Sequence, residues 1–162
     1  MMKIVFLGIG TNLGKRENNL EHAMASIGLS IGPVLMSSSI YETEPWGFQS
    51  EEEFLNMVVK LETDLTPLVL LERIHTIESL LGRVRGPEQF SSRVIDIDIL
   101  LYGDMIIDED NLKIPHPLLQ ERRFVLVPLC EIAAELLHPV LKKTIEELLE
   151  VCEDKGVVKK YR

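Results

Sequence analysis

The sequence predicts an α+β protein with a ferredoxin-like β-α-β-β-α-β core, in which helices pack on a mainly antiparallel sheet and a helical extension follows towards the C-terminus. Two observations predict this class. Strand-like and helix-like segments alternate in that order, and the two middle strands are joined only by a turn-rich loop, which disfavours a doubly wound parallel sheet. A length of 162 residues fits one domain, and we expect residues 1–162 to form it.

The first half of the chain contains three predicted strands and one predicted helix. Residues 3–9 are apolar almost throughout, which indicates a buried strand. Residues 16–28 carry apolar side chains at helical spacing, and residues 34–41 are rich in serine and β-branched residues, so we expect a helix and then a strand. Residues 42–53 contain proline, glycine and several acids, which predicts an exposed loop. Residues 54–63 alternate between two faces, as a strand does.

The second half begins with a clear helix start. The threonine–proline pair at 66–67 places a capping residue before a proline, and Gly82 should end the helix. Residues 83–92 are polar and contain glycine and proline, so we expect a loop. Residues 93–102 predict a strand, and residues 112–114 a short one.

The C-terminal part is expected to add helices to this core. Residues 124–137 predict a helix with Pro128 in its first turn or bending it. Thr144 and Glu147 have the spacing of a capping box, which predicts another helix start. Residues 157–161 are interpreted as a last strand or a tail.

The composition indicates which partners to expect. A net charge of −9 disfavours a general nucleic-acid-binding surface. No segment reaches the roughly 18 apolar residues that a membrane span needs. The apolar first residues are not followed by a small-residue cleavage pattern, and two cysteines without a secretion signal favour reduced thiols. We therefore expect a cytoplasmic protein that binds neither nucleic acid nor membrane, and its length favours a monomer.

The strongest chemical signal is a pair of carboxylates on one predicted strand. Asp96 and Asp98 are two residues apart, so their side chains share a face, while Ile95, Ile97 and Ile99 form the opposite, buried face. Two carboxylates this close repel each other unless a cation lies between them. Mg²⁺ is the natural cation for oxygen ligands shared with phosphates, and two such ions can flank a transferring phosphoryl group. The alternative is the solvated face of an edge strand.

A basic patch lies close to these acids in the sequence. Arginine matches the geometry of phosphate oxygens, and an anionic ligand would need such a patch on an acidic protein. The alternative for the first two arginines is an exposed basic loop. Five of the eight arginines belong to the patch: Arg83, Arg85, Arg93, Arg122 and Arg123.

Glu78 is a second unusual acid. It continues an apolar helical stripe formed by Leu71, Ile74 and Leu81, which should face the sheet. A carboxylate in that position needs a partner or a ligand. The alternative is a glutamate at the edge of the stripe that reaches water.

Aromatic and amide side chains suggest a flat heterocyclic ligand. Trp46, the only tryptophan, lies with Phe48 in the predicted loop, and Phe54 shares a strand face with Asn56. A heterocycle is held by aromatic stacking and by hydrogen bonds at its edge. Ordinary core packing is the alternative for Phe54.

Several other motifs are excluded. The glycines at 8, 10 and 14 miss the spacing of a dinucleotide-binding loop, and there is no Walker-type phosphate loop. The four histidines lack zinc-ligand spacing. Two rival functions stay open from the residues alone: another two-metal enzyme, such as a nuclease or nucleotidyltransferase, and a non-catalytic ferredoxin-like binding module.

Taken together, these residues resemble the 6-hydroxymethyl-7,8-dihydropterin pyrophosphokinase family over nearly the whole chain. The Arg-x-x-Asp-x-Asp pattern at 93–98 is the most specific part. Other matching segments are 10–14 (GTNLG), 41–47 (YETEPWG), 54–56 (FLN), Glu78 with 82–85 (GRVR), 115–117 (PHP) and 122–129 (RRFVLVPL). Three positions depart from the family: Ser91-Ser92 stands where it commonly has Gly-Pro, Phe90 where some members have tryptophan, and Ala134 where proline is familiar.

The resemblance implies transfer of pyrophosphate from ATP to 6-hydroxymethyl-7,8-dihydropterin, with two Mg²⁺ ions bound by Asp96 and Asp98. It implies that Arg83 and Arg93 stabilise the transition state. The residues implied in ATP binding are Glu78, Arg85, Phe90, Ile99, Asn111, Lys113, His116 and Arg122. Those implied in pterin binding are Thr43, Glu44, Trp46, Phe54, Asn56 and Phe124. The resemblance also implies mobile lids around 43–53 and 83–93.

Overall fold

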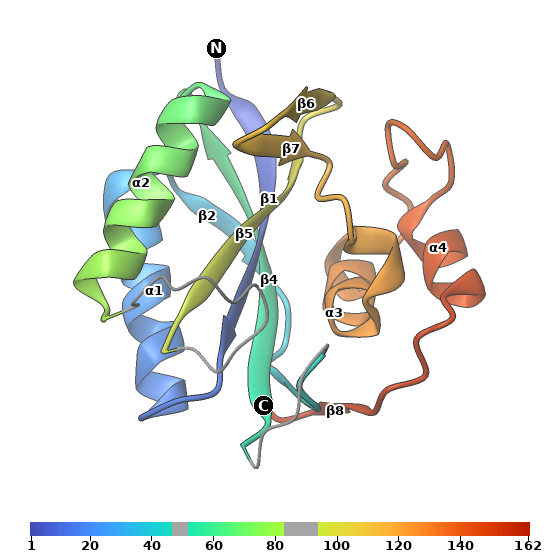
Figure 1. Cartoon of the computed structure of the whole chain (residues 1–162). Helices are drawn as coiled ribbons and strands as arrows, with labels where there is room; N and C mark the ends of the chain where they lie inside the picture. Colours follow the sequence, from blue (N-terminus) through green and yellow to red (C-terminus); the bar gives the residue numbers. More distant parts are fainter. Residues whose placement is uncertain (47–51, 83–93) are drawn as a thin grey trace.

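A computed structural model of the chain describes residues 1–46, 52–82 and 94–162, and Figure 1 shows its arrangement. The elements, in chain order, are β1 (Lys3–Thr11), α1 (Arg16–Ser30), β2 (Val34–Ser37), β3 (Tyr41–Thr43), β4 (Phe54–Thr63), α2 (Pro67–Leu80), β5 (Asp96–Tyr102), β6 (Ile107–Glu109), β7 (Leu112–Ile114), the 3₁₀ turn η1 (Leu119–Glu121), α3 (Arg123–Ala133), α4 (Ile145–Val151) and β8 (Val158–Lys160).

A six-stranded sheet lies at the centre, with strand order β5-β1-β4-β3-β8 and with β2 also paired to β4. Its pairings among the described strands are antiparallel. β6 and β7 form a separate two-stranded hairpin. β1 lies between β5 and β4, and α1 and α2 connect strands of this sheet. This is the predicted ferredoxin-like core, so the predicted fold class is confirmed.

Side-chain alternation along the central strands divides the core into two parts. Leu7, Leu55 and Ile97 belong to the cluster that packs against α1 and α2. Phe6 and Val58 belong to the cluster that packs against α3 and α4. Figure 1 shows the same layers, with α1 and α2 on one side of the sheet and α3 and α4 on the other. None of the helices in the described ranges has the length and apolar character needed to cross a membrane.

Several predicted boundaries are confirmed by the local interactions that set them. β4 covers the predicted residues 54–63. Thr66 caps α2, because its hydroxyl accepts the backbone N–H of Val69 at 3.4 Å. Thr144 and Glu147 form the predicted capping box at the start of α4. The last strand, β8, pairs with β3.

The strand predicted at 34–41 is two strands, β2 and β3, and the loop prediction was wrong for residues 42 and 43, which belong to β3. Ser38, just after β2, still donates its backbone N–H to the carbonyl of Val58 in β4 at 2.8 Å, but its hydroxyl, rather than a backbone carbonyl, accepts the N–H of Val58 at 2.9 Å. The next residue, Ser39, donates its N–H to the carboxylate of Glu131 in α3, at 3.0 Å from the nearer oxygen. Between the end of β2 and the start of β3, these side-chain bonds take the place of ladder bonds to β4.

Other boundaries also differ from the prediction. β1 extends to Thr11 and β5 begins at Asp96. α1 continues to Ser30, and α3 ends at Ala133. Pro128 is the sixth residue of α3, beyond its first turn, and its ring is buried. A proline there removes one helical hydrogen bond, and burial of the apolar ring offsets that loss.

Candidate active site

A cavity lies on the face of the sheet that α3 covers. It encloses about 640 Å³ of space between atoms, part of it open to solvent. β1, β4 and β5 form its floor, the β3 end and Trp46 form one wall, and α3 with the residue before it forms another. Asp96, Asp98 and the six residues predicted to bind the pterin all line this one cavity: Thr43, Glu44, Trp46, Phe54, Asn56 and Phe124.

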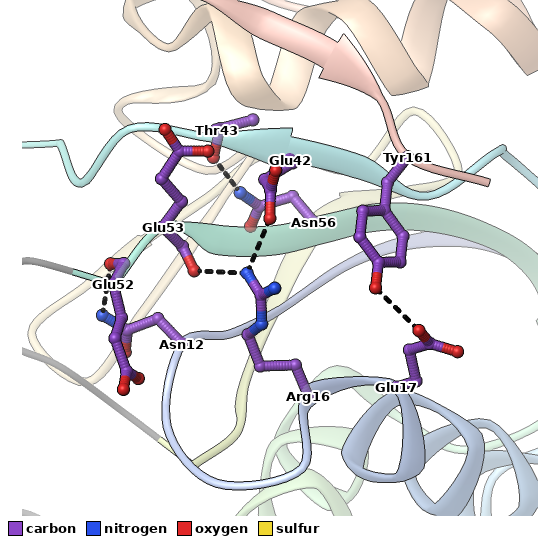
Figure 2. Close-up of polar contacts among 9 residues, drawn as sticks. All are labelled: Asn12, Arg16, Glu17, Glu42, Thr43, Glu52, Glu53, Asn56 and Tyr161. Carbon is purple, nitrogen blue, oxygen red and sulfur yellow. Dashed lines mark hydrogen bonds and ion pairs between the residues drawn. The ribbon is translucent and has the colours of Figure 1, made fainter.

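The polar part of the floor depends on a glycine. Asn56 is buried, and its amide nitrogen donates to the hydroxyl of Thr43 at 2.6 Å, as Figure 2 shows. Gly10 pairs with Asn56 across β1 and β4. A Cβ on Gly10 would lie 2.6 Å from the Asn56 amide oxygen, which is closer than real contacts allow. Only glycine therefore leaves this amide in place, facing the cavity.

The aromatic part is built around an arginine. The guanidinium of Arg122 lies 4.8 Å from the ring centre of Trp46 and 5.5 Å from that of Phe124. Arg122 is 8% exposed, so these cation–π contacts are largely shielded from water. Phe54 lines the same cavity from the start of β4. The cavity thus combines flat apolar surfaces with a positive charge.

Asp96 and Asp98 provide the negative charge. They pair with Gly10 and Gly8 of β1, so side-chain atoms on the neighbouring strand do not cover them. Their shared face lines the cavity, while Ile97 and Ile99 are in the core on the other face. β5 lies at the edge of the described sheet and Asp98 is 33% exposed, as the solvated-edge alternative expects, but both acids also line the cavity.

This donor set fits Mg²⁺. No group of three or more histidine, cysteine or acidic side chains in residues 1–46, 52–82 and 94–162 could form a closed metal site. Mg²⁺ does not need one, because it is commonly bound by one or two carboxylates together with water and substrate phosphates. Asp96 and Asp98, which open onto the cavity, supply that kind of partial ligand set.

Glu78 lies below these acids, inside the core. It is 1% exposed, so the alternative of a glutamate that reaches water is wrong. Its carboxylate accepts the backbone N–H of Ile97, the residue between Asp96 and Asp98, at 2.9 Å. Glu78 does not line the cavity. The sequence identified it as an unusual buried acid, and the structure gives it a partner in β5.

His116 stands beside the acids. Its Nδ1 accepts the N–H of Leu118 at 3.1 Å, so the neutral ring carries its proton on Nε2, which lies 4.0 Å from Asp98 Oδ1. Burial, and then the nearby charge of Arg122, lower the pKa of His116 from 6.5 to about 4, against an opposing effect of Asp96. The ring is therefore neutral at pH 7 and presents an N–H donor beside Asp98.

The remaining predicted nucleotide contacts are spread over different places. The Ile99 side chain is in the core. Asn111 is exposed in the turn between β6 and β7, and Lys113 is exposed on β7, where it pairs with Asp108 at 2.5 Å. Arg83, Arg85, Phe90 and Arg93 lie outside the described residues, together with the whole predicted lid at 83–93 and residues 47–51 of the lid predicted around 43–53.

Sequence reasoning missed the residues that support the cavity. The residues around Gly8 and Gly10 led only to a rejected dinucleotide motif and, for Gly10, to a matching family segment. Glycines two apart on a strand also predict a flat, open patch on one face, and both line the cavity. Asn12 entered only as part of the matching segment 10–14, and Arg16 was not singled out. Figure 2 shows Arg16 reaching Glu42 and Glu53, and Asn12 reaching Glu52, at the two ends of the loop predicted at residues 42–53. Their partners lie 26 to 40 residues away, which no local pattern reveals.

Residues 6–134 match the family model for 7,8-dihydro-6-hydroxymethylpterin-pyrophosphokinase (HPPK). The chain is 39% identical to the 2-amino-4-hydroxy-6-hydroxymethyldihydropteridine pyrophosphokinase of Aquifex aeolicus over 148 residues, covering 90% of each chain. It is 41% identical to the Bacillus subtilis enzyme of the same name over 137 residues, covering 84% of this chain and 81% of that one.

Solved structures show the same fold. The crystal structure of wild-type Plasmodium falciparum HPPK-DHPS with pterin and p-hydroxybenzoate matches with a TM-score of 0.75 and 21% identity over 93% of this chain. Another HPPK-DHPS structure, in complex with substrates, matches with a TM-score of 0.74 and 17% identity over 91%. The chain spans 43% of the length of each of these two chains. At these identities the likeness supports the fold alone.

Proposed function

The chain belongs to the 7,8-dihydro-6-hydroxymethylpterin-pyrophosphokinase family, and we infer from this that it transfers pyrophosphate from ATP to 6-hydroxymethyl-7,8-dihydropterin in folate synthesis. The chain covers 90% of the length of its Aquifex aeolicus relative, so this inference concerns the whole activity named for that protein. The observation that carries it is the cavity, which brings together a carboxylate pair, aromatic rings and a buried amide. Those are the groups needed for a metal-bound triphosphate and a flat heterocycle.

We propose that the pterin binds between Phe54 and Phe124, with Asn56 and the backbone of residues 43–46 at its polar edge. Both rings line the cavity, which supports stacking on a heterocycle. Asn56 already donates to Thr43, so its amide has a defined orientation before any ligand binds. A preorganised hydrogen-bonding edge selects for a ligand with matching donors and acceptors.

We propose that Asp96 and Asp98 hold two Mg²⁺ ions together with the ATP phosphates. When bound, such ions supply charge neutralisation for the phosphate oxygens and a fixed in-line geometry. His116 donates its Nε2–H to a phosphate oxygen, because its Nδ1 is already an acceptor for Leu118. Arg122 adds a positive charge at the cavity wall. Arg83, Arg85 and Arg93 are assigned to the triphosphate by the family resemblance, with Arg83 and Arg93 stabilising the transition state.

In the proposed reaction the hydroxymethyl oxygen of the pterin attacks the β-phosphorus of ATP. The bond between that phosphorus and the oxygen bridging to the α-phosphate breaks, AMP leaves, and the hydroxyl proton is released. The chain's contribution is positioning and electrostatic stabilisation, which carry most of the acceleration in phosphoryl transfer. Asn56 and the two phenylalanines orient the pterin, which accepts the pyrophosphate. Asp96, Asp98 and His116 orient the ATP, which donates it.

The other expectations from the sequence also stay predictions. These are an adenine and ribose site near Ile99, Asn111 and Lys113, ATP contacts by Glu78 and Phe90, a monomeric state, a cytoplasmic location, and no binding of nucleic acid or membrane. Support for the last comes from the net charge of −9, which opposes binding to polyanions.

One assay tests the function against its rivals. The purified protein is incubated with ATP, Mg²⁺ and 6-hydroxymethyl-7,8-dihydropterin, and the products are separated by chromatography. AMP and a pterin pyrophosphate in equal amounts are the expected result. Release of free pyrophosphate, or cutting of a phosphodiester, would favour a nucleotidyltransferase or nuclease. No consumption of ATP would favour a binding module.

A further inference from the structure

We propose that Arg16 is a positioning residue for pterin binding, acting from the face of the sheet opposite to the cavity. The inference rests on the proposed function for the identity of the ligand. Arg16 is the first residue of α1, which packs on the other face of the sheet from α3, and it does not line the cavity. Its effect on the ligand is therefore indirect, through the two strands that carry Thr43 and Phe54.

The guanidinium of Arg16 joins these two strands. Its Nη1 donates to Oε2 of Glu42 in β3 at 3.0 Å and to the backbone carbonyl of Glu53, just before β4, at 2.9 Å. Figure 2 shows both bonds from the same nitrogen. The next residues along the chain are Thr43 and Phe54, which are cross-strand partners and both line the cavity. Side chains alternate along a strand, so a contact to Glu42 reaches β3 from behind its cavity face.

The bonds of Arg16 fix the polar edge that the ligand would meet. β3 has only three residues, so few ladder hydrogen bonds hold it against β4. Thr43 ends this short strand and accepts the amide of Asn56. A small displacement of Thr43 changes the orientation of that amide, and binding groups must be held within a fraction of an ångström to act.

Other contacts hold Arg16 and its surroundings in place. Its guanidinium lies 5.8 Å from the ring centre of Tyr161, whose hydroxyl bonds to Glu17 at 2.7 Å. Asn12, in the connection between β1 and α1, donates its side-chain amide to the carbonyl of Glu52 at 3.4 Å. Asn12 and Arg16 therefore contact Glu42, Glu52 and Glu53, at the two ends of the loop predicted at residues 42–53, and Arg16 makes the two shorter bonds.

The partial exposure of the Arg16–Glu42 ion pair predicts that a change at Arg16 affects pterin affinity more than stability. The side chains of Arg16 and Glu42 are 26% and 28% exposed, and ion pairs of this kind contribute little to global stability. A purely structural arginine would change the melting temperature and both substrate affinities together. A positioning arginine changes the pterin affinity while the melting temperature and ATP affinity stay nearly constant.

The test compares Arg16→Gln with a matched control, Arg73→Gln. Arg73 is an exposed arginine of α2 that donates to the carbonyl of Ser30, far along α1 from the cavity. Titration calorimetry gives the Kd of the pterin and of Mg²⁺-ATP, with Trp46 fluorescence as a second readout. We expect Arg16→Gln to weaken pterin binding about tenfold, with the Kd of ATP within about twofold and the melting temperature within about 2 °C of the wild type. Arg73→Gln should match the wild type in both affinities.

Two further variants sharpen the result. Glu42→Gln should weaken pterin binding less than Arg16→Gln, because the bond to the Glu53 carbonyl remains. Arg16→Lys should recover part of the affinity, since an ammonium can donate to one of the two acceptors. If Arg16→Gln does not fold, Glu42→Gln serves with the same readouts. Unchanged pterin affinity, or equal losses of both affinities with a lowered melting temperature, would overturn the proposal.

Failure of the proposed function would show itself separately, as a wild-type protein that does not bind the pterin. In that case hydrogen exchange of the ligand-free protein decides the role of Arg16. Faster exchange in residues 41–46 and 52–56 of Arg16→Gln, and not of Arg73→Gln, would support positioning of these strands. Exchange equal to the wild type would refute it.

Discussion

The carboxylate of Glu78 in α2 accepts the backbone N–H of Ile97 in β5 at 2.9 Å, from within the core. Ile97 lies between Asp96 and Asp98, so this bond holds one of the two peptide groups that separate the cavity acids. An acid on an apolar helix face is thus tied to the backbone of the proposed catalytic strand.

Two replacements of Glu78 should separate the effect of its hydrogen bond from the effect of its charge. Glu78→Ala leaves the Ile97 N–H buried without this acceptor, which should lower the free energy of unfolding by about 1–3 kcal/mol. It should also raise the Mg²⁺ concentration needed for half-maximal turnover. Glu78→Gln should keep most of both properties, because an amide oxygen also accepts. Urea denaturation and Mg²⁺ titration check this, and a glutamine variant as impaired as the alanine variant would show that the charge itself is needed.

Asp98 should be required for turnover without being required for folding. In Asp98→Asn the side chain keeps its size but loses the charge that binds Mg²⁺, so formation of AMP should fall by at least about a hundredfold. Thermal denaturation should show a melting temperature equal to or above that of the wild type, because repulsion from Asp96 is removed. Asp104→Asn, at an exposed position, is the control. Turnover that survived in Asp98→Asn would exclude the metal role.

Adding a methyl group at Gly10, in the variant Gly10→Ala, should weaken pterin binding. The added Cβ of Gly10→Ala meets the Asn56 amide oxygen at 2.6 Å and must displace it. We expect the Kd of the pterin to rise at least about tenfold, with a stability loss of about 1–3 kcal/mol from overpacking. Gly28→Ala, within α1, meets nothing within 4 Å and should leave binding unchanged and stability slightly higher. Pterin titration of a folded Gly10→Ala protein with wild-type affinity would contradict this account of the floor.

His138 should make stability fall in mild acid. Its Nδ1 accepts the N–H groups of Val140 at 3.2 Å and Leu141 at 3.0 Å, and burial lowers its pKa below the ordinary value of 6.5. The unfolded chain then binds the proton more readily than the folded one. Its contribution to stability is complete above pH about 6.5 and is lost as the pH falls from there towards the lowered folded pKa.

The measurement for His138 is urea denaturation at several pH values between about 8 and 5. His138→Asn keeps an acceptor in the place of Nδ1 but does not titrate, so its free energy of unfolding should decline less between pH 7 and 5 than that of the wild type. His22→Asn, at an exposed position, should follow the wild-type curve. Identical slopes for His138→Asn and the wild type would contradict the prediction.

Local patterns predicted the main elements well and their interruptions poorly. The alternation in residues 54–63 and the capping residues Thr66 and Thr144 predicted β4, α2 and α4 because each signal lies within its own segment. The break between β2 and β3 was missed because it depends on a contact between Ser38 and Val58, which are 20 residues apart in the sequence. Nothing near Ser38 in the sequence indicates that its hydroxyl takes over a ladder bond.

The sequence by itself determined that Asp96 and Asp98 share a face, that Glu78 is an acid on an apolar helical stripe, and that aromatic and amide side chains accompany them, because periodicity is a property of a single element. Only the tertiary structure decided that Gly10 lies against Asn56, that Glu78 reaches Ile97, and that Arg16 supports β3 and β4 from behind. Those relationships depend on strand order and register, which arise when separate elements pack together and which no single segment encodes.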